Sequence, residues 1–448
     1  MNISVPVPRR SFLAMVAGCT AYALLNPNGL ANAAEPKLND DEFLDDLSHR
    51  SFNFFWDQSD PNTGIMRDRA RTDGSESPKE RRDTGSTGAT GFSLTAMCVG
   101  AERKWVTRQQ ARERVRATLK AYANGPVKNE HGWFYHFVNV KTGERTGASE
   151  ISTSDATWLL AGALTARQYF REDDEIGRLA TLIYERMDYT WMCNGELTLE
   201  HGWAPEGGFL KNRYDHYCQL ACMYLCGIGS PTHAMKPECW YAWKRDLNEY
   251  AGYKYVGKSL LWTYQWPFAW FDLRDRREAQ GLHINYWENS ANATRAHKAF
   301  CLDLAKKFPG CYSENIWGIT SSESAHGYKA WGGPPAHPSI DGTVVPCAPA
   351  GSLMFTPDIC LPALRAMKEQ FGDKIYGQYG FADAFHPTKG WVCPDALGID
   401  VGITLLSSEN SRSGNVWKWF MANPEAQRAL VLADLHPIAG NDTQQTKS

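Results

Sequence analysis

Apolar residues recur at helical spacing along almost the whole chain after the first forty positions. Residues three and four positions apart share one face of an α-helix, so this pattern predicts helix after helix, with only short β-like pieces such as 133–140 between them. Caps and breakers set the approximate ends. The predicted helices are 41–56, 88–103, 107–123, 154–170, 174–187, 215–228, 237–247, 287–307, 357–371, 402–421 and 424–435.

Three connections between these helices are long and rich in Gly, Pro and aromatic residues: 252–285, 318–349 and 376–400. Loops of this length inside a domain are usually functional. No charge run or Ser/Gly linker divides the body, so we predict one domain over 34–448. The predicted fold class is all-α, a toroid of concentric helix pairs with long loops and a few short β pieces.

The first 33 residues have the pattern of an export signal. Arg9-Arg10 precedes an apolar run over 12–25, and Ala31-Asn32-Ala33 supplies small residues for cleavage. We therefore predict a twin-arginine signal peptide over 1–33 and a periplasmic or extracellular location. An alternative is a lipoprotein cleavage box at 16–19, which would leave a lipid anchor on Cys19. No later apolar run is long enough to span a bilayer.

The 448 residues include 47 Lys and Arg against 50 Asp and Glu, a formal charge of −3. Removing the signal leaves 45 basic residues and a charge of −5. This balance offers no broad basic surface for nucleic acid or acidic lipid. The 17 Trp residues could provide flat surfaces for sugar rings, although Trp is also ordinary core material.

Twelve cysteines are expected to stay as free thiols, because twin-arginine substrates usually fold in a reducing compartment before export. Cys218, Cys222 and Cys226 share one helix face, which resembles a metal-binding stripe but is also typical of small residues at a close helix contact. We favour packing. No paired C-x-x-C and no H-E-x-x-H occurs, so no metal and no other cofactor is predicted.

Acidic residues meet aromatic and turn residues in the loops, where catalytic chemistry is expected. Asp155 could cap a helix that starts near Ser154, or act in catalysis or sugar binding. Asp215 could be a cap, a partner of Arg213 or a catalytic acid. Asp400 closes a loop and starts a helix. Carboxylates beside aromatic rings on a helical toroid favour glycoside hydrolysis, in which one acid protonates the leaving oxygen and another activates water.

Several ordered motifs carry a resemblance to a known family. They are 132–137 (GWFYHF), 203–209 (WAPEGGF), 229–233 (GSPTH), 286–290 (YWENS), 313–318 (SENIWG), 380–385 (GFADAF), 400–402 (DVG) and 409–414 (ENSRSG). Together they resemble the bacterial glycoamylase-like family, which includes β-1,2-glucanases, over residues 52–430. The resemblance implies an (α/α)6 barrel, a bound glucan polysaccharide or oligosaccharide, and inverting hydrolysis by two carboxylates without a metal.

The resemblance also assigns roles and exposes one departure. Asp155 and Asp400 match family acids, and either is expected to be the base. Where the family has a Glu as its candidate acid, this chain has Gln219, which cannot donate a proton as a carboxylic acid does. Either Asp215 or Glu206 replaces it, or the chain is a binding or transglycosylating relative, or it is an altered form of an active enzyme.

The same resemblance implies substrate-binding residues. Stacking platforms are expected at Trp133, Tyr135, Trp203, Trp317 and Trp391. Hydroxyl partners are expected at Arg69, Asn289, Glu314 and His386.

Overall fold

The computed structural model describes residues 38–257 and 260–438. The chain divides into two units, 1–42 and 43–448, and the description below concerns the second. The predicted export signal and Cys19 lie outside the described residues. Among the described residues, no helix combines the length and apolar character needed to cross a membrane.

Helices dominate the structure, as the apolar spacing predicts. The α-helices are α2 (Asp40–Gln58), α3 (Lys79–Arg82), α4 (Thr87–Glu102), α5 (Arg108–Ala123), α6 (Thr153–Tyr169), α7 (Asp174–Arg186), α8 (Tyr189–Cys193), α9 (Leu220–Ile228), α10 (Tyr286–Leu304), α11 (Cys347–Ala350), α12 (Pro357–Phe371), α13 (Gly398–Arg412), α14 (Asn415–Met421) and α15 (Pro424–Leu432). Short 3₁₀ helices are η1 (Pro237–Tyr241), η2 (Leu261–Tyr264), η3 (Trp266–Phe268) and η4 (Gly372–Lys374).

The strands are short and pair antiparallel between loops. They are β1 (Arg69–Arg71), β2 (Thr84–Ser86), β3 (Asn129–Glu130), β4 (Trp133–Phe134), β5 (Phe137–Asn139), β6 (Ile151–Ser152), β7 (Leu199–Glu200), β8 (Gly202–Ala204), β9 (Gly208–Phe209), β10 (Arg213–Tyr214), β11 (Leu247–Tyr250), β12 (Tyr253–Val256), β13 (Arg276–Glu278), β14 (Tyr376–Gly377), β15 (Gly380–Phe381), β16 (Asp395–Leu397) and β17 (Leu435–Pro437).

Three predicted helices differ from the observed ones by more than three residues at an end. The segment 237–247 forms only η1 before the chain extends into β11. The predicted helix 402–421 is two helices, because Gly414 adopts a left-handed conformation with φ of 68° that ends α13 and precedes α14. The predicted helix 215–228 starts later, at Leu220, because the preceding residues form β10 and a turn.

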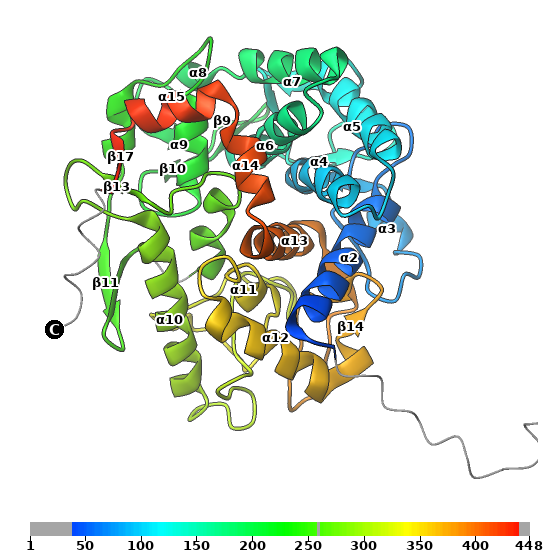
Figure 1. The fold of residues 1–448 in the computed structure, drawn as a ribbon, viewed down its shortest axis with the longest axis vertical. Helices are drawn as coiled ribbons and strands as arrows, with labels where there is room; N and C mark the ends of the chain where they lie inside the picture. Colours follow the sequence, from blue (N-terminus) through cyan, green and yellow to red (C-terminus); the bar gives the residue numbers. More distant parts are fainter. Residues whose placement is uncertain (1–37, 258–259, 439–448) are drawn as a thin grey trace, which may run out of the picture. The chain divides into compact units, whose positions relative to one another are not determined.

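The helices form an inner and an outer layer (Figure 1). Helices α4, α6, α9 and α13 are buried on nearly all sides, which is the pattern of an inner helix. Helix α7 buries only one stripe, at positions 176, 179, 180, 183 and 184, and so belongs to the outer layer. The inner layer runs in sequence order through α4, α6, α9 and η3, continues to α11 through a hydrogen bond from Gln265 to Ala348, and closes because α11 packs against α13 and α13 against α4.

The closest inner contact joins α4 to α6 through two glycines. A Cβ atom at Gly91 would lie 2.1 Å from the carbonyl oxygen of Trp158, and one at Gly162 would lie 2.0 Å from the carbonyl oxygen of Gly91. The absence of side chains at these positions therefore sets the separation of the two helices.

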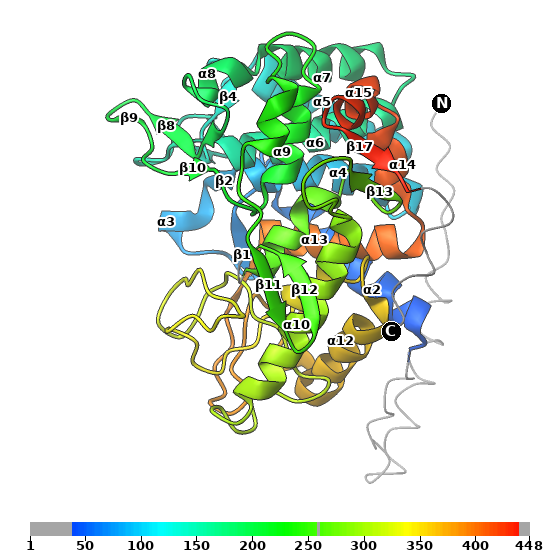
Figure 2. The same cartoon turned by 90° about the vertical axis from the view of Figure 1, so that its left-hand side faces the viewer.

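Three inner helices begin directly after a short strand, on the same side of the unit. Strands β2, β6 and β16 lead into α4, α6 and α13, and Figure 2 shows β1, β2 and β8 gathered on that side with the loop before α11. The first turns of these helices therefore face the region where the long loops lie.

Candidate active site

Asp155 lies in the first turn of α6, and its carboxylate is held by hydroxyl groups. Ser152 caps the helix and donates to Asp155 Oδ2 at 2.6 Å, and Ser154 donates to the same oxygen at 3.3 Å. Neither Ser154 nor Asp155 is the cap, because Ser152 already occupies that position. The other oxygen of Asp155 is 3.6 Å from His136 Nε2.

His136 stands between two carboxylates. Its Nδ1 atom is 2.9 Å from Glu150 Oε1, and its Nε2 atom faces Asp155. Burial by itself would lower the pKa of His136, but the charges of Asp155 and Glu150 outweigh it and raise the pKa to about 9. The imidazole is therefore protonated at neutral pH, and the His136–Asp155 pair holds a transferable proton.

Asp400 lies in the first turn of α13 and faces Asp383, which follows β15. Both carboxyls are buried and line one small cavity with Cys347 and Tyr379. Burial raises the pKa of Asp400 to about 6, although contacts with Asp383 and Cys347 lower it. Burial and the facing Asp400 raise the pKa of Asp383 well above its usual range.

Two acidic pairs, Asp155–His136 and Asp383–Asp400, lie near Asp68 and its partner Arg69. Arg69 donates to Asp68 at 2.8 Å and to Glu323 at 2.6 Å. The charge of Asp68 acts on both His136 and Asp400. This placement follows from the pairing of β1 with β16, in which Arg69 is opposite Leu397. Because Asp68 directly precedes β1, it lies at the start of α13, which directly follows β16.

Each of the two predicted substitutes for the missing acid is paired with a basic residue. Glu206 is an exposed residue of the turn between β8 and β9 and forms an ion pair with Arg145, which lowers the pKa of Glu206. Asp215 is half-exposed and bonds His216 at 2.7 Å. Gln219 lies near the start of α6. The buried Tyr214 hydroxyl contacts both Gln219 and Ser154, and the charge of Asp155 acts on the same hydroxyl.

Four of the predicted substrate-binding residues are buried within the fold. The Trp133 and Trp317 rings are fully buried and present no face to a sugar. The Asn289 amide bonds both backbone groups of Val256 and joins α10 to β12. His386 is buried and contacts the carbonyl oxygen of Asp341.

The other predicted binding residues keep accessible surface. Tyr135, Trp203 and Trp391 are partly exposed, and Arg69 lies among the acids described above. Glu314 is exposed and forms an ion pair with Lys298 on α10.

The sequence reasoning missed Asp68, His136, Glu150, Asp383 and Glu323. His136 and Asp383 stand inside the quoted motifs 132–137 and 380–385, and Asp68 is adjacent to Arg69, so a signal was present. Which of these residues meet is decided by contacts between segments remote in sequence.

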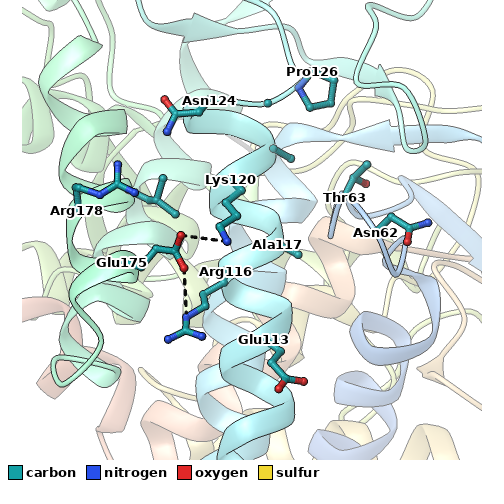
Figure 3. A pocket seen from close by; sticks show the side chains of 13 residues that line it. Asn62, Thr63, Glu113, Arg116, Ala117, Lys120, Asn124, Pro126, Glu175 and Arg178 are labelled. Carbon is teal, nitrogen blue, oxygen red and sulfur yellow. Dashed lines mark ion pairs between the residues drawn. The ribbon is translucent and has the colours of Figure 1, made fainter.

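A wider hollow lies on the outer layer between α5 and α7 (Figure 3). Its charges pair with each other, since Glu175 is 3.0 Å from Lys120 Nζ and 3.7 Å from Arg116 Nε. None of the paired buried acids lines it, so it is not the candidate active site.

Cys222 and Cys226 are buried in α9 among apolar residues, with their sulfur atoms 3.9 Å apart. This position agrees with the packing interpretation of the cysteine stripe. Within the described ranges, no group of three or more His, Cys, Asp or Glu residues is arranged to hold a metal ion.

The layered helices and the carboxyls at their first turns define an α/α-barrel protein with an acid-lined site. The glycoamylase family model matches residues 211–424 of the chain. An endo-β-1,2-glucanase from Chitinophaga pinensis, solved with sophorotriose and glucose, superposes with a TM-score of 0.82 at 26% identity and covers 89% of this chain and 99% of its own. These likenesses confirm the predicted α/α-barrel fold and the resemblance to the glycoamylase-like family.

A curated relative adds a reaction. An exo-β-1,2-glucooligosaccharide sophorohydrolase that acts at the non-reducing end, from Parabacteroides distasonis, is 26% identical over 453 residues. The match covers 91% of this chain but only 60% of the relative.

Proposed function

We propose that this protein is a glycoside hydrolase that cleaves β-1,2-linked glucan. The observation that carries the proposal is the placement of two acidic pairs, Asp383–Asp400 and Asp155–His136, at the first turns of two inner helices. The activities of the sophorohydrolase and the endo-β-1,2-glucanase that resemble this chain support the choice of linkage.

In the proposed reaction, Asp400 is the general base. Its raised pKa of about 6 leaves it ionised at neutral pH, yet more basic than an ordinary Asp, which suits a group that takes a proton from water. The resulting hydroxide attacks the anomeric carbon, and the glycosidic carbon–oxygen bond breaks with inversion.

The leaving oxygen receives its proton from the His136–Asp155 pair. His136 holds the proton at neutral pH, and Asp155 is its contact on α6. The His136–Asp155 pair loses one proton and Asp400 gains one. The overall reaction therefore adds one water molecule across the glycosidic bond. This arrangement provides a proton donor although Gln219 stands where the related family has a Glu.

Arg69 and the partly exposed rings are proposed to bind the glucan. Arg69 lies between the two acidic pairs, where its donors can reach sugar hydroxyls. Tyr135 lies under Arg145 at 5.1 Å, which holds its ring in one orientation. Flat rings such as Tyr135 and Trp203 are suited to stacking against a sugar.

Gln219 favours a second candidate function. It lies beside Ser154 and Tyr214, close to Asp155, and cannot supply a proton. A chain that depended on a carboxylic acid there would bind glucan, or transfer glycosyl groups, without efficient hydrolysis.

The test is a product profile. Purified residues 34–448 are incubated with linear β-1,2-glucan and, in parallel, with β-1,3-, β-1,4- and α-1,4-glucans, and the products are separated by chromatography. Short oligosaccharides from the β-1,2 polymer alone are expected, and NMR of the fresh products reports inversion. The Asp400→Asn variant should release nothing, while Asp303→Asn, at an exposed carboxylate of α10, should match the wild type.

Two other outcomes would overturn part of the proposal, either the hydrolytic activity or the substrate. Activity that appears only in Gln219→Glu would show that the native chain binds or transfers glucan. Cleavage of another linkage would overturn the substrate.

We also propose export through the twin-arginine route, on the basis of Arg9 and Arg10. Replacing both with Lys should retain the protein in the cytoplasm, as measured by cell fractionation. Labelling with a radioactive fatty acid separates cleavage near Ala33 from lipidation of Cys19.

A further inference from the structure

Asp383 is held rigidly beside Asp400. Its Oδ2 atom accepts a hydrogen bond from the backbone N–H of Glu323 at 2.7 Å, and its own N–H donates to the carbonyl oxygen of Asp395 at 3.2 Å. Only 3% of the residue is exposed. The other oxygen, Oδ1, is buried and accepts no hydrogen bond from the described residues.

In the part of the chain that the structure describes, no Lys, Arg or His forms an ion pair with either carboxyl. Arg69, whose charge acts on Asp400, donates to Asp68 and Glu323 instead. Among the described residues, no nitrogen or hydroxyl donor reaches Asp383 Oδ1 or Asp400 Oδ2. Two buried carboxylates in contact cannot both stay ionised without a cation, so the pair must share one proton.

The surroundings decide which carboxyl keeps that proton. Asp383 lies beside the Glu323 carboxylate, which disfavours a second negative charge, whereas the charge of Arg69 favours the ionised form of Asp400. Desolvation of its hydroxyl, and then the charges of Asp400 and Asp383, raise the pKa of Tyr328, although half of this residue is exposed.

We propose that Asp383 is a positioning residue, a neutral carboxylic acid whose O–H donates to Asp400 and orients that carboxylate toward the attacking water. The proposal rests on the assignment of Asp400 as the base. It gives Asp383 a function that requires no contact with the substrate.

Two substitutions separate this function from simple packing. Asp383→Asn can accept from the Glu323 N–H and donate its amide N–H to Asp400, so it should keep kcat within about threefold of the wild type and leave the acid limb of the pH profile near 6. Asp383→Ala removes the donor. It should lower kcat about tenfold or more and move the acid limb to higher pH, because the ionised Asp400 loses a hydrogen bond.

The opposite sign would overturn the proposal. If Asp383 were ionised in the native protein, Asp383→Asn would delete a negative charge beside Asp400 and move the acid limb to lower pH. Equal loss of activity in the Asn and Ala variants would point to a packing role alone.

A second measurement does not depend on turnover. The infrared spectrum of the wild type at pH 7 should contain the carbonyl band of a buried protonated carboxyl, and this band should vanish in Asp383→Asn. It should persist in the control Asp395→Asn, because Asp395 is paired with Arg71 and Arg81 at 3.5 Å. Absence of the band in the wild type would contradict the shared proton, whereas the band without hydrolysis would contradict only the proposed function.

Discussion

The burial of Asp400 makes its carboxylate more basic and lowers the stability of the folded protein. Ionising Asp400 costs free energy in the folded state, because burial raises its pKa to about 6 from an ordinary value of 3.8. This cost is fully present above pH 6 and disappears below pH 4, where the group is protonated in both the folded and the unfolded chain.

Asp400→Asn should therefore abolish turnover without loss of stability. At pH 7 we expect the free energy of unfolding to stay the same or to rise by up to about 3 kcal/mol, with the gain shrinking as the pH falls toward 4. Urea unfolding at pH 7 and pH 5 measures this difference. A marked loss of stability would show instead that Asp400 is structural.

A glycine on the neighbouring helix sets the position of the other acid. A Cβ atom at Gly88 of α4 would lie 2.3 Å from Asp155 Oδ1. In Gly88→Ala the Asp155 carboxylate must swing away, so we expect kcat to fall about tenfold to a hundredfold while the melting temperature stays near that of the wild type. Gly177→Ala is the matched control, because nothing lies within 4 Å of the added methyl group on α7; an equal kcat in both variants would contradict the prediction.

At the scale of elements, His136 ties the turn between β4 and β5 to the start of α6. Its pKa is raised to about 9, so its ion pairs contribute stability that is fully present below about pH 6.5 and is lost as the pH rises through 9. His136→Gln should lower the free energy of unfolding by about 1–2 kcal/mol at pH 6 and by much less at pH 10. Chemical unfolding at both pH values measures this change.

The control is His326→Gln, at an exposed histidine. It should show no such pH dependence. A loss in His136→Gln that is equal at pH 6 and pH 10 would mean that the ring contributes packing with Phe137, 3.9 Å away, rather than charge.

At the scale of the whole unit, the last strand of the described chain closes onto a loop from its middle. Strand β17 pairs with β13, which ends at the fully buried Glu278. Glu278 accepts hydrogen bonds from Arg245 at 2.7 Å, Trp240 at 3.0 Å and Tyr286 at 2.6 Å. The C-terminal segment therefore depends on one buried ionic network.

Glu278→Gln should destabilise the protein by about 3 kcal/mol, because it leaves the Arg245 guanidinium buried without its counter-charge. Thermal unfolding measures the loss, and Glu314→Gln, at an exposed ion pair, should change the melting temperature little. An equal, small effect in both variants would show that the buried network adds little to stability.

Much of the fold and part of the site could be predicted from the sequence by itself. Helix positions follow from the local spacing of apolar residues, so long helices such as α5, α7 and α12 were predicted within a residue or two. The breaks at Gly414 and before α9 were missed, because a single backbone conformation or a short strand leaves little periodic signal. Asp155 and Asp400 were identified from their place near a helix start and their match to family acids, and Arg69 from the family resemblance alone.

The tertiary structure decided which of those residues meet. Asp68 reaches the start of α13 only because β1 pairs with β16, from opposite ends of the chain, and Asp383 faces Asp400 only because both line one cavity. Whether a Trp ring is a platform or core, as at Trp133 and Trp317, depends on what covers it. Periodicity is a property of neighbours along the chain, whereas burial, shared protons and ion pairs arise between segments that only the closed helical layers bring together.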